Sequence, residues 1–367
     1  MKPRLLLVLT LLVIVALRLA SPSEMQRAVE AGSAPSSAET ATSTPLGLAY
    51  LPLVTNRQLP LLTPTASATS MPTASATPAP SATPSSANHI PPFSHIFTIV
   101  MENEAYEQII GNTRSAPYIN SLAQQYGLAT NYYGITHPSL PNYISLIGGD
   151  TLGIVNDCTD CFVNAPNLVD QLESAGKSWK AYMEDMPSSC FIGDSGPLYR
   201  QKHNPFIYFD DIRLNAARCT KLVPFTQFAT DLQANRLPDY VWIGPNMCHD
   251  IHDCPLADGD AWLQSWVAKI LASPAWQQNG VLFITWDEGR ASDNTGCCQY
   301  ANGGHILTLV LSRLGKPAYQ SSTAYAHYSL LRTIEEAWGL PALGKAECVC
   351  SAPMEEFFSA VPAGRRP

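Results

Sequence analysis

The stretch Gly134-Ile-Thr-His-Pro-Ser-Leu-Pro-Asn-Tyr-Ile-Ser-Leu-Ile-Gly-Gly149 predicts a tight loop that runs into a short helix. Pro138 and Pro141 stiffen the approach, and Pro141 suits a first helical turn, where its missing N–H costs nothing. The glycine pair ends the helix. Ser139 then lies just outside the helix N-terminus, where free N–H groups and the helix dipole favour an anion. This position suits a nucleophile that attacks a phosphate. The plainer interpretation is a helix-capping serine.

Apolar runs that alternate with amphipathic segments predict the fold class. Strands are expected at 95–101, 128–133, 178–183, 240–244, 281–286 and 306–311. Helices are expected at 167–174, 258–272, 325–338 and from the cap Ser115 to Tyr126. This alternation predicts an α/β fold, a three-layer sandwich in which a mostly parallel sheet lies between helices. Ligands bind such folds beyond the carboxyl ends of the strands.

The 367 residues divide into three parts of different composition. Residues 1–20 combine a basic start, a short apolar run and small residues, which predicts a secretory signal peptide, or an N-terminal anchor if it stays uncleaved. Residues 21–92 are dominated by Ser, Thr, Pro and Ala and predict a disordered stalk. Residues 93–367 have the length of one large α/β domain. The net charge of −8 and the lack of a basic run exclude nucleic acid as an expected partner, and a membrane is expected only through an uncleaved N-terminal segment.

All ten cysteines lie in this last part. An even number behind a signal peptide predicts disulfides formed in an oxidising compartment, so the protein is expected to be secreted or on the cell surface. Cys158 and Cys161 have the spacing of half a zinc site. A disulfide is the better interpretation, because no matching distant pair follows. Cys248 and Cys254 are expected to bridge and to fix the loop between them.

Two pairs of residues, each directly after a predicted strand and each containing at least one acid, indicate a cation site. We call them the two acidic pairs. Glu102 and Asn103 follow one strand, and Asp287 and Glu288 follow another. All four are expected at one edge of the sheet near Ser139. Crowded carboxylates repel unless a cation lies between them, and oxygen ligands favour Mg²⁺, Mn²⁺ or Ca²⁺ over zinc or iron. A cation in contact with the serine hydroxyl would lower its pKa. Any one of these residues alone is better explained as a helix-capping residue in a loop. Two such pairs, each at the end of a buried strand, are not well explained in that way.

A histidine-rich segment follows the strand expected at 240–244 and reaches the same edge. His252 is the candidate general acid, because a departing alkoxide needs a proton donor, and His249 is the second candidate. Asp250 and Asp253 stand where they can orient these rings. One of the two histidines is equally well explained as a structural hydrogen-bonding residue.

Other basic residues and histidines carry weaker signals. Lys202, His203 and Arg290 are candidates for binding an anion, although Lys202 alone is more simply explained as a solvated charge. His305 and His327 are equally well explained as supporting or helix-capping residues. The sequence leaves the roles of these three histidines open.

Seven short motifs occur in a fixed order along the chain. They are Met101-Glu-Asn, Ala116-Pro-Tyr-Ile-Asn-Ser-Leu, Thr136-His-Pro-Ser-Leu-Pro-Asn-Tyr, Lys202-His-Asn-Pro, His249-Asp-Ile-His-Asp, Thr285-Trp-Asp-Glu-Gly and His327-Tyr-Ser-Leu-Leu-Arg-Thr-Ile-Glu. Each is weak alone. Together, from residue 95 to about residue 341, they resemble the secreted bacterial acid phosphatase and phospholipase C phosphoesterase family, within the alkaline-phosphatase-like superfamily.

The resemblance implies a nucleophile and a single site for a hard metal ion. It implies Ser139 as the nucleophile rather than Ser145, and Asn142 as a ligand of a phosphate oxygen. His252 is the histidine carried over most directly. The metal ligands implied by the resemblance are Glu102, Asn103, Ser139, Asp287 and Glu288.

The expected function is therefore a secreted, metal-dependent phosphomonoesterase of the acid phosphatase type that acts through a phosphoserine intermediate. The alternatives are a phospholipase C-type phosphodiesterase and a phosphatidylinositol phosphate phosphatase. The expected substrate is a small phosphate ester or a phospholipid headgroup, and the expected state is a monomer. A sulfatase is disfavoured, because Tyr143 stands where that family has an arginine. A stalked adhesin on an inactive fold is disfavoured because no acidic ligand is missing.

Overall fold

The computed structural model describes residues 90–359. The signal peptide expected at 1–20 and nearly all of the stalk expected at 21–92 lie outside the described residues. The described residues all belong to one unit. No helix in this range is long and apolar enough to cross a bilayer.

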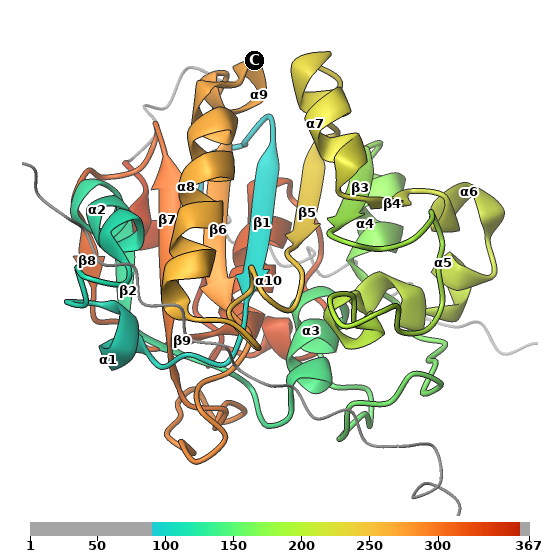
Figure 1. Cartoon of the computed structure of the whole chain (residues 1–367), viewed down its shortest axis with the longest axis horizontal. Helices are drawn as coiled ribbons and strands as arrows, with labels where there is room; N and C mark the ends of the chain where they lie inside the picture. Colours follow the sequence, from blue (N-terminus) through green and yellow to red (C-terminus); the bar gives the residue numbers. More distant parts are fainter. Residues whose placement is uncertain (1–89, 360–367) are drawn as a thin grey trace, which may run out of the picture. The chain divides into compact units, whose positions relative to one another are not determined.

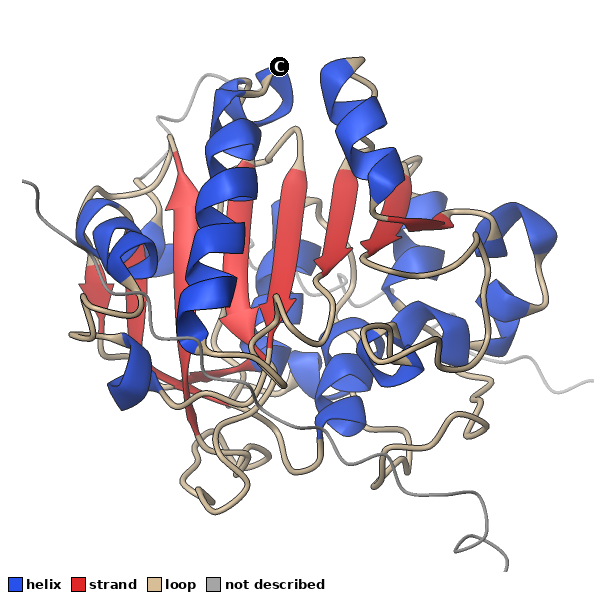
Figure 2. Cartoon of the chain, in the orientation of Figure 1, coloured by secondary structure: helices blue, strands red, loops and turns tan. Residues whose placement is uncertain are grey.

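A nine-stranded sheet forms the centre of the described residues (Figures 1 and 2). Its strands are β1 (Ile96–Met101), β2 (Gly127–Tyr133), β3 (Trp179–Met183), β4 (Leu222–Pro224), β5 (Tyr240–Gly244), β6 (Val281–Trp286), β7 (His305–Ser312), β8 (Gln320–Ser321) and β9 (Tyr325–Ala326). The strand order is β4-β3-β5-β1-β6-β7-β2-β8, and β9 also pairs with β2. β7 runs antiparallel to β6 and β2, whereas the other paired strands of the sheet are parallel. The predicted α/β class with a mostly parallel sheet is confirmed.

The central strands are buried because nearly all of their side chains are apolar. β1, β5 and β6 are buried along their whole length. Such strands stay out of water only when helices cover both faces of the sheet. β5 and β6 have the predicted bounds, β1, β2 and β3 differ by one residue at one end, and β7 is longer by one residue at each end. β4, β8 and β9 escaped prediction because two or three residues are too few to show a period.

Helices cover both faces of this sheet. They are α1 (Tyr106–Ile109), α2 (Pro117–Gln125), α3 (Ser139–Gly148), α4 (Leu168–Ser174), α5 (Asp210–Arg213), α6 (Ala216–Cys219), α7 (Thr226–Gln233), α8 (Leu256–Ala272), α9 (Pro274–Gln277) and α10 (His327–Ala337). Short 3₁₀ turns occupy Gln201–His203, Pro205–Tyr208, Gly344–Glu347 and Glu355–Phe357. In Figure 1, α2, α7 and α8 lie in front of the sheet, and α4 and α10 lie behind it. The predicted sandwich of three layers is thus present.

Several helix starts differ from the predictions. The helix expected at 258–272 begins two residues earlier, at Leu256, and the helix expected at 167–174 begins at Leu168. The helix expected to be capped by Ser115 begins at Pro117 with Ala116 as its N-cap, and the N–H of Ser115 donates to Asn112 in the preceding turn. The last helix begins at His327 rather than two residues earlier, because those two residues pair with β2 as β9. Ser139 is the first residue of α3 instead of lying just outside it.

The cysteines of the described residues form five disulfides, and none of them is free. The predicted bridges Cys158–Cys161 and Cys248–Cys254 are both present. The others are Cys190–Cys219, Cys297–Cys298 and Cys348–Cys350.

Candidate active site

The two acidic pairs lie side by side at one edge of the sheet. β1 and β6 pair in parallel, with Met101 opposite Trp286 at the last position of both strands. The residues that follow, Glu102 and Asp287, are therefore brought together, and both are fully buried. The backbone N–H of Asn103 donates to Asp287 Oδ1 at 3.2 Å. Strand register alone thus positions the acids.

Ser139 joins these acids from the loop that follows β2. Its side chain is buried, and its Oγ donates to Glu102 Oε2 at 3.0 Å and faces Glu288 Oε1 at 3.4 Å. Gly134 lets the loop approach the β6 edge, because a Cβ at this position would lie 2.8 Å from the Asp287 carbonyl oxygen. The result is a buried hydroxyl between two carboxylates at the start of a helix.

Asn142 holds the shape of this loop. Its Oδ1 accepts from the backbone N–H groups of Ile135 at 2.7 Å and Thr136 at 3.1 Å. Its amide donates to the carbonyl oxygens of Thr136 at 2.8 Å and Pro138 at 3.1 Å. Both amide hydrogens are engaged, so no donor of Asn142 is free for the phosphate contact that the resemblance implied. In this structure Asn142 is a positioning residue for Ser139.

Lys202 enters the site instead of being solvated. Its Nζ lies 3.4 Å from Ser139 Oγ and 2.9 Å from Asp157 Oδ2, and its side chain is only 16% exposed. Burial would lower the pKa of Lys202, but the charges of Glu102 and Asp157 raise it above its usual value. A permanent positive charge therefore lies beside the serine hydroxyl.

His252 reaches the same point through Lys202. Its Nδ1 pairs with Asp253 at 2.7 Å, and its Nε2 lies 3.4 Å from Lys202 Nζ. With the proton on Nδ1, Nε2 accepts from the ammonium. His249, the second candidate acid, pairs through Nδ1 with Glu184 at 2.8 Å.

His203, whose role the sequence left open, is buried beside Glu102. Its Nε2 lies 3.0 Å from Glu102 Oε1, its Nδ1 lies 3.1 Å from Asp250 Oδ2, and its ring stacks on Tyr143. Burial would lower the pKa of His203, but the charge of Glu102 and the bond to Asp250 raise it to about 9. The ring is therefore a cation at neutral pH.

The carboxyl groups differ in how well they are neutralised. Burial opposes ionisation of Glu102, but His203 and Lys202 outweigh it and lower its pKa to about 2. Burial and then the charge of Glu102 raise the pKa of Asp287 well above its usual range. The same two causes raise the pKa of Glu288 to about 8. These acids are crowded with too little positive charge, an arrangement that a bound cation would relieve.

The chemistry of this donor set fits a hard divalent ion, because all of its ligand atoms are oxygens. Asp287 Oδ2 is buried without a hydrogen-bond partner. Among residues 90–359, only one group of three potential ligands has its atoms within 4.8 Å of one another, and it consists of a disulfide-bonded cysteine pair and Asp258. Cation binding would therefore draw the carboxylates of Glu102, Asp287 and Glu288 closer together.

Two histidines support the site from its β6 side. His137, which the sequence analysis did not single out, pairs through Nδ1 with Glu288 Oε2 at 2.6 Å and through Nε2 with the Asp293 carbonyl at 2.8 Å. His327 Nε2 lies 2.5 Å from the Asp287 carbonyl oxygen. Burial lowers the pKa of His327 to about 4, so its ring is neutral and donates this bond.

The last two candidates contact residues outside this cluster. His305 pairs with Glu107 at 2.6 Å, and Arg290, 57% exposed, lies 3.8 Å from Glu104. Among the described residues, neither makes a hydrogen bond or ion pair with Ser139 or with the two acidic pairs.

The sequence and the fold together define the class of this protein. The model of the Phosphoesterase family matches residues 112–341, so the chain belongs to the Phosphoesterase family. It is 34% identical over 264 residues to a phosphatidylinositol-3-phosphatase of Mycobacterium tuberculosis, covering 71% of this chain and 82% of that protein. It is 32% identical over 267 residues to an acid phosphatase of Aspergillus fumigatus, covering 70% of this chain and 57% of that protein. The chain thus spans less than two thirds of this fungal relative.

Solved structures share the architecture. The lipoteichoic acid synthase LtaP from Listeria monocytogenes superposes with a TM-score of 0.50 at 11% identity, covering 73% of this chain and 77% of that one. A protein in the alkaline phosphatase superfamily from Vibrio parahaemolyticus gives 0.48 at 11% identity, with 71% of each chain covered. At such identities the likeness to LtaP concerns the fold alone.

Proposed function

We propose that this protein is a metal-dependent phosphomonoesterase in which Ser139 is the nucleophile. One observation carries the proposal. Ser139 is the first residue of α3, and its Oγ is hydrogen-bonded to ionised Glu102 and lies 3.4 Å from the Lys202 ammonium. Nucleophile, oriented acceptor and positive charge thus surround one position at which a phosphorus atom fits. Membership of the Phosphoesterase family and the names of its phosphatase relatives support the same activity.

The proposed cation site uses oxygen atoms only. We assign it to Glu102, Asn103, Ser139, Asp287 and Glu288, with Mg²⁺, Mn²⁺ or Ca²⁺ as the preferred ions. When bound, the ion would supply charge stabilisation to the serine alkoxide and to the phosphate oxygens. The raised pKa values of Asp287 and Glu288 support this assignment, because such carboxyls gain most from a nearby cation.

The chain's own residues account for binding and proton movement. Lys202 offers an ammonium to a dianionic phosphate, and the protonated ring of His203 offsets the charge of Glu102 beside it. The Ser139 hydroxyl passes its proton to Glu102 Oε2, which accepts its hydrogen bond, as the Oγ–P bond forms and the bond from phosphorus to the leaving oxygen breaks. His252, protonated on both ring nitrogens in this step, gives the Nε2 proton to the leaving oxygen. For this transfer Lys202 has to turn from His252 Nε2 towards the phosphate. His252 then takes a proton from the water that cleaves the phosphoserine, and the proton on Glu102 returns to Ser139 Oγ as it leaves phosphorus.

The Lys202 ammonium beside Ser139 favours a monoester dianion over a diester, which carries a single charge. A phospholipase C-type diesterase is the alternative, because a part of the chain resembles phospholipase C A of M. tuberculosis, at 30% identity over 128 residues. A phosphatidylinositol phosphate phosphatase would use the same site on a lipid monoester. Comparing an aryl phosphate with its choline diester separates the first two. We further propose that the protein is a monomer and lies outside the cytoplasm. The five disulfides support the extracytoplasmic location.

The Ser139→Ala variant tests the proposed function. It is expected to lower kcat for an aryl phosphate by at least about 10³-fold, because the attacking atom is lost. Ser145→Ala is the matched control, since Ser145 lies in the same helix and its Oγ contacts Tyr328 instead. A chelator is expected to abolish turnover by wild type until Mg²⁺ or Mn²⁺ is restored. Activity of Ser139→Ala near wild type would remove Ser139 from this role.

A further inference from the structure

The side chain of Asp157 binds two groups that flank the candidate nucleophile. Its Oδ1 accepts from the backbone N–H of Leu140 at 3.0 Å, and its Oδ2 accepts from Lys202 Nζ at 2.9 Å. Leu140 directly follows Ser139 in α3, and Lys202 Nζ lies 3.4 Å from Ser139 Oγ. One carboxylate therefore spans two donors beside the atom that is proposed to attack phosphorus. The proposed reaction steps give Asp157 no role.

A phosphate group on Ser139 would use the same two donors. Its free oxygens project from Oγ at the start of α3, where backbone N–H groups and the positive end of the helix dipole favour an anion. The next residue after Leu140 is Pro141, which has no N–H to offer. Lys202 adds the ammonium beside Oγ, and ammonium groups are strong donors to phosphate. A carboxylate and a phosphate cannot occupy these donors together.

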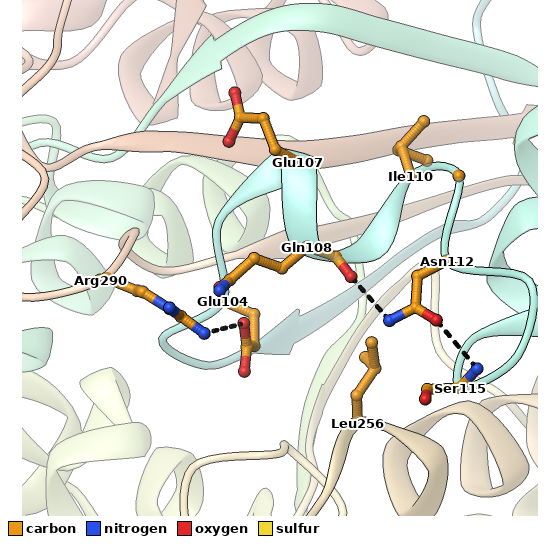
Figure 3. A pocket seen from close by; sticks show the side chains of 9 residues that line it. Glu104, Glu107, Gln108, Ile110, Asn112, Ser115, Leu256 and Arg290 are labelled. Atoms are coloured by element: carbon orange, nitrogen blue, oxygen red, sulfur yellow. Dashed lines mark hydrogen bonds and ion pairs between the residues drawn. The ribbon is translucent and has the colours of Figure 1, made fainter.

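Arg290 does not substitute for Lys202 at this point. It lies 3.8 Å from Glu104, at the groove shown in Figure 3. None of the residues that contact Ser139 lines this groove. A phosphate at Ser139 therefore depends on the ammonium that Asp157 holds.

The loop between α3 and α4 allows the Asp157 side chain to leave its donors. Buried Ile154 anchors the chain before Asp157, and the Cys158–Cys161 disulfide closes the turn after it. The carbonyl oxygen of Cys158 accepts from Tyr208 Oη at 2.7 Å. The Asp157 side chain is 29% exposed, so a rotation about its own bonds takes the carboxylate into water. The backbone on either side stays anchored during this rotation.

We propose that Asp157 is an internal competitor of the phosphate group. Its carboxylate occupies the phosphate position in the free enzyme, turns away when a phosphate ester binds, and returns to displace the inorganic phosphate product. No covalent bond changes in this exchange, since one anion replaces another at Lys202 and Leu140. The proposal rests on the phosphomonoesterase function.

The alternative is that Asp157 only holds Lys202 in place for the substrate. The two roles predict opposite effects on phosphate affinity. Removal of a competitor strengthens phosphate binding, because a larger fraction of the molecules has free donors. Removal of a support weakens it, because the ammonium is no longer kept beside Ser139.

The test measures inhibition of aryl phosphate hydrolysis by inorganic phosphate, with the metal-loaded full-length protein. Asp157→Asn keeps the shape of the side chain and removes its charge. Its Ki for phosphate is expected to fall by at least about fivefold relative to wild type. KM for the aryl phosphate should fall with it, whereas kcat should not rise, because the product leaves more slowly. Asp160→Asn is the matched control, since Asp160 is an exposed acid in the same loop. Its Ki is expected to stay within about twofold of wild type, because exposed charges are screened.

Calorimetric titration of the same proteins with inorganic phosphate repeats the comparison without turnover. An unchanged or higher Ki in Asp157→Asn would overturn the competition. An equal fall in both variants would also overturn it, because a general effect of charge would then account for the result. In both cases the phosphomonoesterase function stands. Failure of wild type to hydrolyse the aryl phosphate would overturn that function and the competition together.

Discussion

The surroundings of Lys202 in the structure differ from those that its sequence context suggests. In the sequence it is one lysine in a loop, for which solvation is the simplest explanation. In the structure its ammonium contacts Asp157, His252 and Ser139 and is mostly buried. The ion pair with Asp157 offsets the cost of burying this charge and keeps the ammonium beside the nucleophile. Lys202 therefore serves as the proposed anchor for the phosphate dianion.

Replacement of Lys202 by methionine keeps the length of the side chain and removes its charge. We predict a loss in kcat/KM of about 10²–10³-fold for an aryl phosphate, the scale of losing one preorganised donor. The loss for the corresponding choline diester should be smaller, since a diester carries less negative charge. Lys180→Met is the control, because Lys180 pairs with Asp231 at 2.7 Å on β3. Equal losses for both substrates would contradict the role in charge recognition.

At the scale of elements, the site depends on where strands end and helices begin. The register of β1 and β6 brings the acids together, and the loop from β2 to α3 adds the hydroxyl. α10 supports them from behind, because its first residue, His327, holds the Asp287 backbone at 2.5 Å. A protonated ring could donate the same bond, but the burial of His327 disfavours its protonation, and this burial links the start of the helix to pH.

His327 should therefore make folding stability depend on pH. Its pKa is about 4 in the folded protein, below the ordinary value of 6.5. A depressed pKa gives stability that is present above about pH 6.5 and is lost as pH falls through about 4. We predict that, relative to His327→Gln, the wild type loses up to about 3 kcal/mol of unfolding free energy over this window. Chemical denaturation of both proteins in chelator at several pH values measures the difference. Parallel curves would show that His327 is not buried in its neutral form.

At the scale of the whole molecule, the sheet and the acidic pairs were predictable, and the irregular segments were not. The long apolar runs marked β1, β5 and β6, and strand order then determined where Glu102 and Asp287 meet. Strand periodicity says nothing about how a loop folds back, so the contacts of Lys202 and His203 could not be predicted from the sequence. The Lys202-His-Asn-Pro motif was the only signal for them.

The same limit applies to Asn142 and His249, whose predicted roles in phosphate binding and proton transfer stay predictions. Both residues carry suitable polar groups and lie near the site in sequence. In the structure, Asn142 is hydrogen-bonded to the backbone around Thr136, and His249 pairs with Glu184. Contacts of this kind are visible only once the loops are folded. His137 was not singled out, because its partner Glu288 is distant in the sequence.

The stereochemical course at phosphorus tests the central claim most directly. A chiral, isotopically labelled phosphate monoester would be transferred to an acceptor alcohol by the metal-loaded enzyme, and the configuration of the product determined. Attack by Ser139 followed by attack on the phosphoserine makes two in-line displacements, so the account predicts retention of configuration. Inversion would mean a single displacement without a covalent intermediate, and would contradict the role of Ser139 as the nucleophile.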